Sequence, residues 1–285
     1  MGTSYSMKSD KEIQARSISS KLSNISKEKN IAYRYVSINF FIERMIARIL
    51  TTPLKDDLIF KGGYVGLRVY NSKRYTVDLD AVLNSKNSKE QLSILQEAIE
   101  SDLHDGVWFK LEREESLPLQ TNRGGMKQIY RVGLGKVPGN LSRASVIHFD
   151  IGFDDVIIPD PIDMKTSFIL GEGDISWKVY PVETIIAEKL HAFIFREGGS
   201  SRAKDLYDLS FYLPQANLNN LKLAVKACFK HRETKVPESI YKTMKGYDFS
   251  LVKKSWNKVS SVVLQGSEFD YCLEKVLQNL KKMGL

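Results

Sequence analysis

Two aspartates, Asp78 and Asp80, lie two positions apart in a segment that alternates like a β-strand, Tyr75–Leu83. Side chains at positions i and i+2 of a strand point to the same face, so these carboxylates would stand about 7 Å apart at the backbone. Divalent cations such as Mg²⁺ or Mn²⁺ relieve the repulsion between such acids and also bind substrate phosphates. Two such ions can hold the attacking and leaving oxygens of a phosphoryl displacement. The pair therefore predicts a metal site for phosphoryl transfer, the alternative being a solvated strand face.

A pair of glycines precedes these acids, in the segment Lys61-Gly62-Gly63. Glycines let backbone N–H groups approach a phosphate closely, although an ordinary turn would use them equally well. A third carboxylate, Asp150, lies in the apolar strand segment 146–151. An unpaired acid is expensive to bury there, and either a metal or a salt bridge would offset that cost.

Other potential ligands are weaker. Asp154 and Asp155 have the character of a turn. His148 shares a strand face with Asp150, but a single histidine is more often a packing residue than a ligand. The two cysteines, Cys228 and Cys272, are too few for a disulfide framework and lack the spacing of metal ligands.

Charged side chains also lie on two predicted helices, 182–196 and 203–213. Lys189 falls within the apolar stripe of the first helix, and Arg196 lies on nearly the same line. A lysine there either extends its amine into water along a packed stem or faces a phosphate in a cleft, and the pattern does not decide between them. Asp205 flanks the stripe of the second helix and would face Lys189 or Arg196. The alternative is that Asp205 forms a structural ion pair or is an acid favoured by the dipole at the helix N-terminus. Asp208 points further away from the stripe.

The elements that must position these residues follow from hydrophobic periodicity. Helical spacing marks residues 34–51 and 88–103, and residues 9–28 are polar and either helical or partly disordered. Strand patterns occupy residues 75–83, 107–111, 128–134, 144–153 and 177–180. The pattern from residue 182 to the end is helical. We expect an α+β chain in which a mixed sheet with flanking helices precedes an all-helical C-terminal region.

Composition limits the class of protein further. The 285 residues are 42% hydrophobic and contain no apolar run long enough to cross a membrane. The polar N-terminus lacks the apolar core of a signal peptide, so a cytoplasmic protein with no membrane partner is expected. The net charge of +8 attracts phosphate polyanions, although an ordinary basic protein would carry the same charge.

Two blocks of residues carry a resemblance to a known family. The first block is KGG at 61–63 with RYTVDLD at 74–80, and the second is YPVE at 180–183, AEKLHA at 187–192 and RAKDLYDL at 202–209. In this order they resemble the AbiEii/AbiGii toxin family of the DNA polymerase beta-like nucleotidyltransferase superfamily, over residues 55–213. Tyr64 departs from the pattern, because relatives often have Thr or Ser after the glycine pair.

The resemblance implies a nucleotidyltransferase-type fold and a role for each motif residue. Metal would be held by Asp78, Asp80 and Asp150, and these acids with Lys189 and Asp205 would be catalytic. The nucleoside triphosphate would contact Lys61, Gly62, Gly63, Arg74 and Thr76, and Arg196 is expected to contact it because it shares the helical line of Lys189. The change of pattern near residues 175–181 adds the expected domains, a polar segment 1–30, a nucleotidyltransferase domain 31–178 and a helical domain 179–285.

The resulting prediction is a metal-dependent enzyme that transfers NMP from an NTP to RNA, tRNA included, or to protein. Such a chain would be the toxin of a toxin–antitoxin or phage-defence system and would have a cognate antitoxin protein. A metal-dependent nuclease and a non-catalytic nucleic-acid-binding protein are the alternatives. Transfer would label or lengthen an RNA, whereas cleavage would shorten it.

Overall fold

The computed structural model describes residues 10–84, 88–117, 124–196, 202–263 and 268–285, so part of the predicted segment 1–30, namely 1–9, lies outside it. In the first part of the chain the elements are α1 (Asp10–Glu28), α2 (Tyr33–Ile49), the 3₁₀ turn η1 (Pro53–Lys55), β1 (Leu58–Lys61), α3 (Gly62–Arg68), β2 (Asp78–Leu83), α4 (Ser88–Glu100), β3 (Val107–Leu117), β4 (Gly125–Leu134), β5 (Ser145–Phe153), β6 (Ile162–Ser167) and β7 (Asp174–Val179). The described elements that follow are all helical: α5 (Val182–Phe195), α6 (Ala203–Tyr212), η2 (Leu213–Gln215), α7 (Leu218–His231), α8 (Ile240–Lys245), α9 (Ser250–Lys254), α10 (Asn257–Ser260) and α11 (Phe269–Met283).

The seven strands within the described residues form one mixed sheet in the order β3-β4-β5-β2-β1-β7-β6. The central strand β2 is antiparallel to β1 and parallel to β5. Its alternate residues Leu79 and Ala81 are fully buried, which leaves Asp78 and Asp80 on the opposite face. The predicted α+β class, with its mixed sheet and flanking helices, is confirmed.

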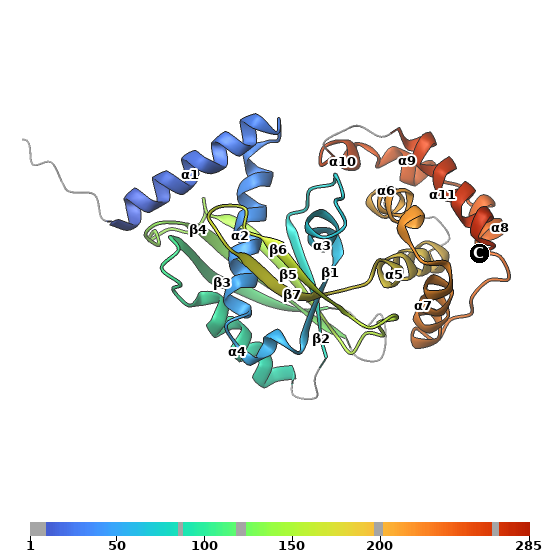
Figure 1. Cartoon of the computed structure of the whole chain (residues 1–285), viewed down its shortest axis with the longest axis horizontal. Coiled ribbons are helices and arrows are strands. Elements are labelled where there is room, and N and C mark those ends of the chain that lie inside the picture. Colours follow the sequence, from blue (N-terminus) through green and yellow to red (C-terminus); the bar gives the residue numbers. More distant parts are fainter. Residues whose placement is uncertain (1–9, 85–87, 118–123, 197–201, 264–267) are drawn as a thin grey trace, which may run out of the picture.

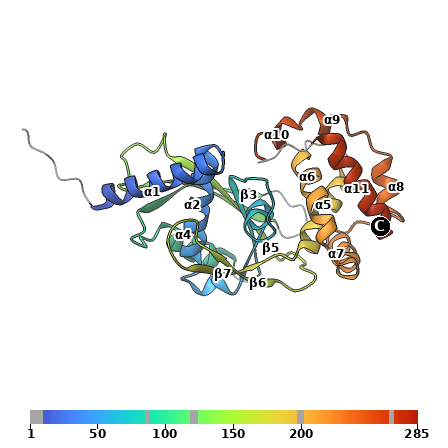
Figure 2. The same cartoon turned by 45° about the horizontal axis from the view of Figure 1, so that its top comes forward.

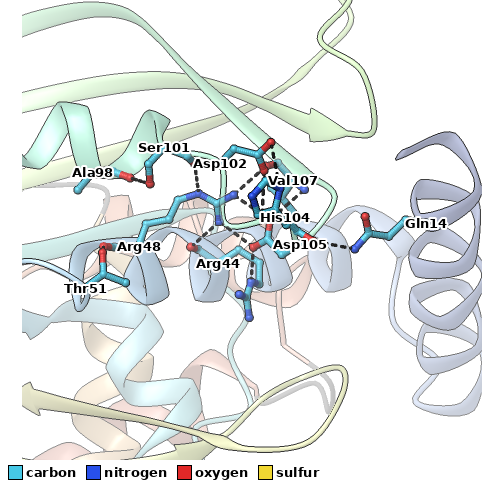
Figure 3. A network of polar contacts seen from close by, with 10 residues as sticks. All are labelled: Gln14, Arg44, Arg48, Thr51, Ala98, Ser101, Asp102, His104, Asp105 and Val107. Atoms are coloured by element: carbon cyan, nitrogen blue, oxygen red, sulfur yellow. Dashed lines mark hydrogen bonds and ion pairs between the residues drawn. The ribbon is translucent and has the colours of Figure 1, made fainter. Parts of the chain in front are cut away.

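A buried arginine fixes one side of this sheet to α2. Arg48 is completely buried, and its guanidinium donates to both carboxylate oxygens of Asp105 at 2.8 Å. It also donates to the backbone carbonyls of Ser101 and Val107, on either side of the turn between α4 and β3 (Figure 3). Paired and bonded in this way, the charge is tolerated in the interior. The network therefore anchors the α4–β3 connection to α2, away from the predicted site residues.

The C-terminal helices gather at one end of the molecule, beside the sheet (Figure 1). The view turned by 45° keeps the same separation between the sheet and these helices (Figure 2). Helix α11 buries Phe269, Cys272, Val276 and Leu280, the one-sided stripe expected of a packed amphipathic helix. Backbone contacts also join the two parts, since Arg74 pairs with Val263 in an isolated β-bridge.

Several elements differ from the local predictions, among them strand β1, which was not predicted, and strand β3, which extends beyond residue 111 to Leu117. The strand predicted to begin at Tyr75 begins at Asp78, because the Tyr75 N–H donates to the Val262 carbonyl instead of a sheet neighbour. Strand β6 was not predicted, since it is an edge strand of mostly exposed, polar residues. Helix α3 was not predicted either, because two glycines begin it and glycine disfavours helices.

Within the described residues no helix has both the length and the apolar character required to span a bilayer. Cys228 and Cys272 are both buried and are not joined by a disulfide.

Candidate functional site

Four polar side chains form a two-by-two array on the neighbouring parallel strands β2 and β5. The register places Asp78 beside His148 and Asp80 beside Asp150. Because the residues within each strand are two positions apart, all four side chains share one face of the sheet. All four line the same cavity. Three carboxylates and one imidazole are thus brought together from segments about seventy residues apart in the chain.

Lysines flank one row of this array. Lys61 on β1 pairs in register with Asp80, and Lys127 on β4 pairs with Asp150. The Lys127 Nζ lies 3.2 Å from Asp150 Oδ1. Burial raises the pKa of Asp80 to about 7, and the neighbouring Asp150 adds to this effect while Lys61 opposes it. The two flanking lysines therefore leave the charge of the acids only partly compensated.

The glycine pair lies directly against the acids. Gly62 begins α3 with a φ of 73°, a conformation that favours glycine. A Cβ atom at this position would lie 2.0 Å from Asp80 Oδ2, so the carboxylate occupies space that any other residue would fill. A Cβ on Gly63 would lie 3.0 Å from Thr76 Cβ and 3.1 Å from Arg74 Nη2. The absence of side chains therefore lets the backbone of the glycine pair lie close against Asp80 and Thr76, and both glycines line the cavity.

A chain of alternating charges lies between α5, α6 and the segment before β2. The Lys189 amine contacts Asp205 Oδ1 at 2.7 Å and Asp208 Oδ2 at 2.8 Å. Arg74 donates to both Asp208 oxygens at 2.8 Å, and Arg202 contacts Asp205 at 2.8 Å. Burial lowers the pKa of Lys189, but the two aspartates outweigh it and the net shift is upward. Lys189 is therefore a fixed, protonated cation held by two aspartates instead of extending its amine into water, and its contact with a phosphate stays a prediction.

The prediction that Asp208 points away from the helix pair is wrong. Its side chain is 1% exposed and lies between Arg74 and Lys189. The helical wheel of α6 alone could not reveal this, because the partner Arg74 comes from a distant part of the chain.

A second set of ion pairs joins β1 to the C-terminal helices. The Lys61 amine donates to Asp155 at 2.6 Å and to Glu188 at 3.0 Å. Glu188 also lies 3.4 Å from Arg232, at the end of α7. Asp155 therefore holds Lys61 rather than serving as one of the clustered acids. The sequence interpretation missed Glu188 and Arg232, and only the position of Glu188 within the second motif could have indicated it.

A cavity of about 450 Å³ brings nearly all of the predicted residues together. Its walls include Lys61, Gly62, Gly63, Arg74, Thr76, Asp78, Asp80, Asp150, Lys189 and Asp205, with Lys127, His148, Glu188, Arg202, Lys204 and Arg232 in addition. Arg196 is the exception, because it is exposed at the end of α5 and is not among the lining residues. Tyr64 points into the core, where its ring meets Trp177 edge-on and its hydroxyl donates to the Asn39 carbonyl.

The acids suit a particular mode of metal binding. Among the described residues, no three His, Cys, Asp or Glu side chains already converge on a point where an ion could sit. Mg²⁺ usually takes only one or two carboxylates and completes its shell with phosphate oxygens and water. Asp78 and Asp80, on one face and beside an open cavity, fit that mode.

Comparison with known proteins identifies the family to which this chain is similar. The family described as nucleotidyl transferase AbiEii toxin, of type IV toxin–antitoxin systems, matches residues 44–268. No curated protein is significantly similar in sequence. The crystal structure of JHP933 from Helicobacter pylori has a TM-score of 0.52 at 17% identity and covers 88% of this chain and 91% of its own. A candidate nucleotidyltransferase from H. pylori has a TM-score of 0.55 at 16% identity and covers 89% and 96%. At these identities the two structures show a shared fold.

Proposed function

Because the chain belongs to the AbiEii family of nucleotidyl transferase toxins of type IV toxin–antitoxin systems, we propose that it transfers NMP from an NTP to RNA in a metal-dependent reaction. The observation that carries the proposal is the single cavity lined by Asp78, Asp80, the Gly62-Gly63 backbone and Lys189. A volume of about 450 Å³ is within the range of small-molecule and nucleotide sites. The family assignment favours transfer over the nuclease and the non-catalytic alternatives.

Each group has a distinct part in the proposed reaction. Asp78 and Asp80 would hold Mg²⁺ or Mn²⁺, which would supply positive charge to the transferring phosphoryl group. The backbone of Gly62 and Gly63 would lie against the triphosphate. Lys189 would add a fixed cation, since Asp205 and Asp208 hold its amine in one place. Asp150 would complete the acidic row, with Lys127 limiting its charge.

The distribution of charge supports RNA as the acceptor. Residues 182–285 contain 17 Lys and Arg against 11 Asp and Glu, a net charge of +6 out of the +8 of the whole chain. The cavity opens beside these helices, with Arg202, Lys204 and Arg232 on its wall. A polyanion would therefore be attracted to the helices that line this side of the cavity.

The test is transfer of label from each of the four NTPs, radioactive at the α-phosphate, to RNA or to protein. The expected result is label in RNA that depends on divalent metal and on one preferred NTP. Label in protein alone would refute the proposal that RNA is the acceptor, while the proposed transferase activity would stand. Shortened, unlabelled RNA would refute the proposed reaction as a whole.

A further inference from the structure

His148 does not pack in the core. Its side chain is 43% exposed and lines the cavity, so the packing role most common for a lone histidine is excluded. Its Nδ1 lies 3.7 Å from Asp78 Oδ1, too far for a direct hydrogen bond. The imidazole therefore stands next to a carboxylate, open to the cavity and without a close bond to it.

The two rows of the array differ in their neighbours. The row of Asp80 and Asp150 has a lysine at each end, Lys61 and Lys127. In the row of Asp78 and His148, the β4 partner of His148 is the buried Ile129, and β1 ends before reaching Asp78. Asp78 thus has an imidazole where the other acids have an ammonium group. A cation entering the array meets the least repulsion at this end.

The geometry allows one ion to bind both side chains. Two donor atoms 3.7 Å apart can contact a common ion, because their separation is less than two bond lengths of about 2.1 Å. Mg²⁺ selects oxygen donors, whereas imidazole nitrogen suits transition-metal ions, with affinity rising from Mn²⁺ towards Co²⁺ and Ni²⁺.

We propose that His148 is a metal ligand together with Asp78, and that it makes the site prefer a first-row transition-metal ion such as Mn²⁺ over Mg²⁺. This inference rests on the proposed metal dependence and adds the identity of the ion and one of its ligands. It concerns binding of the ion, so it can be tested without any transfer reaction.

The experiment measures Mn²⁺ binding by electron paramagnetic resonance, with Mg²⁺ and Co²⁺ as competitors, with and without a non-hydrolysable NTP analogue. The variants are His148→Asn and the matched control His104→Asn, whose side chain is 88% exposed and outside the cavity. We expect His148→Asn to lose about tenfold or more in Mn²⁺ affinity, to change little for Mg²⁺, and to keep its melting temperature in chelator. The control should match the wild type.

A spectroscopic readout on the unmodified protein completes the test. A nitrogen coupled directly to bound Mn²⁺ in electron spin-echo spectra would support the proposal, provided that His148→Asn abolishes it. Mn²⁺ bound with unchanged affinity in His148→Asn, or with no nitrogen coupling, would overturn the ligand role while leaving metal dependence intact. Failure of the wild type to bind Mn²⁺, Co²⁺ or Mg²⁺, even with the NTP analogue, would overturn both the inference and the metal-dependent function.

Discussion

Replacing Gly62 by alanine would perturb the site in two separable ways. The first is conformational: Gly62 has a φ of 73°, and a residue with a Cβ atom loses about 1–2 kcal/mol in that region. The second is steric, since the new Cβ would lie 2.0 Å from Asp80 Oδ2 and 2.7 Å from Asp80 Cγ. The side chain of Asp80 can rotate away, but only by leaving its present position beside Asp78 and Asp150. We therefore expect a modest loss of stability and a large loss of metal binding.

Gly171→Ala provides the matched control. Gly171 has a φ of 88°, but a Cβ there would meet nothing within 4 Å. Both variants should lose about 1–2 kcal/mol of unfolding free energy, equivalent to a fall in melting temperature of roughly 2–8 °C for a chain of this size. Only Gly62→Ala should also lose Mn²⁺ affinity and transfer activity, by about tenfold or more. Calorimetry measures the loss of stability and of Mn²⁺ affinity, and label transfer measures the loss of activity. Normal Mn²⁺ affinity and transfer in Gly62→Ala would refute the requirement for close packing between Gly62 and Asp80.

Three further perturbations follow from the same site. Gly63→Val should weaken NTP binding more than RNA binding in calorimetry, because its side chain would press on Thr76 and fill the phosphate-facing gap; equal losses would indicate misfolding. Lys189→Met should lower transfer by about a hundredfold or more. The substitution should also lower the melting temperature, because it leaves two buried carboxylates with one cation fewer. Transfer at the wild-type rate would show that Lys189 takes no part in the reaction. Burial holds the folded pKa of Asp80 at about 7, against about 4 when unfolded, so the folded state binds more protons and stability in chelator falls as pH rises between these values. In urea titrations Asp80→Asn should therefore be more stable than the wild type at pH 8 and equally stable near pH 4. A variant that is less stable than the wild type at pH 8 would contradict a raised pKa of Asp80 in the folded state.

Local rules predicted much of the site. The strand period of two placed Asp78 and Asp80 on one face. The helical wheel placed Lys189 on the inward stripe and gave Lys189 or Arg196 as the partner of Asp205, of which the structure shows Lys189. The fold class followed in the same way, from alternating segments before residue 180 and helical spacing after it. Such inferences succeed because they depend on the geometry of a single element.

The rest depends on pairing between distant segments. The register that puts His148 beside Asp78 is set by packing of β5 against β2, and nothing in either segment alone reveals it. Asp208 was misplaced for the same reason, since its partner Arg74 precedes β2. Arg196 was expected to contact nucleotide by extending a helical line for seven residues, but at the exposed end of α5 it is outside the cavity.

The most direct test of the proposed function is transfer from an α-labelled NTP to RNA by the wild type and by Asp78→Asn, each with saturating Mn²⁺ and again with chelator. Asp163→Asn is the matched control, because Asp163 is exposed on β6 and does not line the cavity. We predict label in RNA for the wild type and for Asp163→Asn with metal, and none for either with chelator. Asp78→Asn should be folded and should give no label under any condition. Full transfer by Asp78→Asn, or transfer by the wild type that persists in chelator, would contradict a metal-dependent reaction at this site.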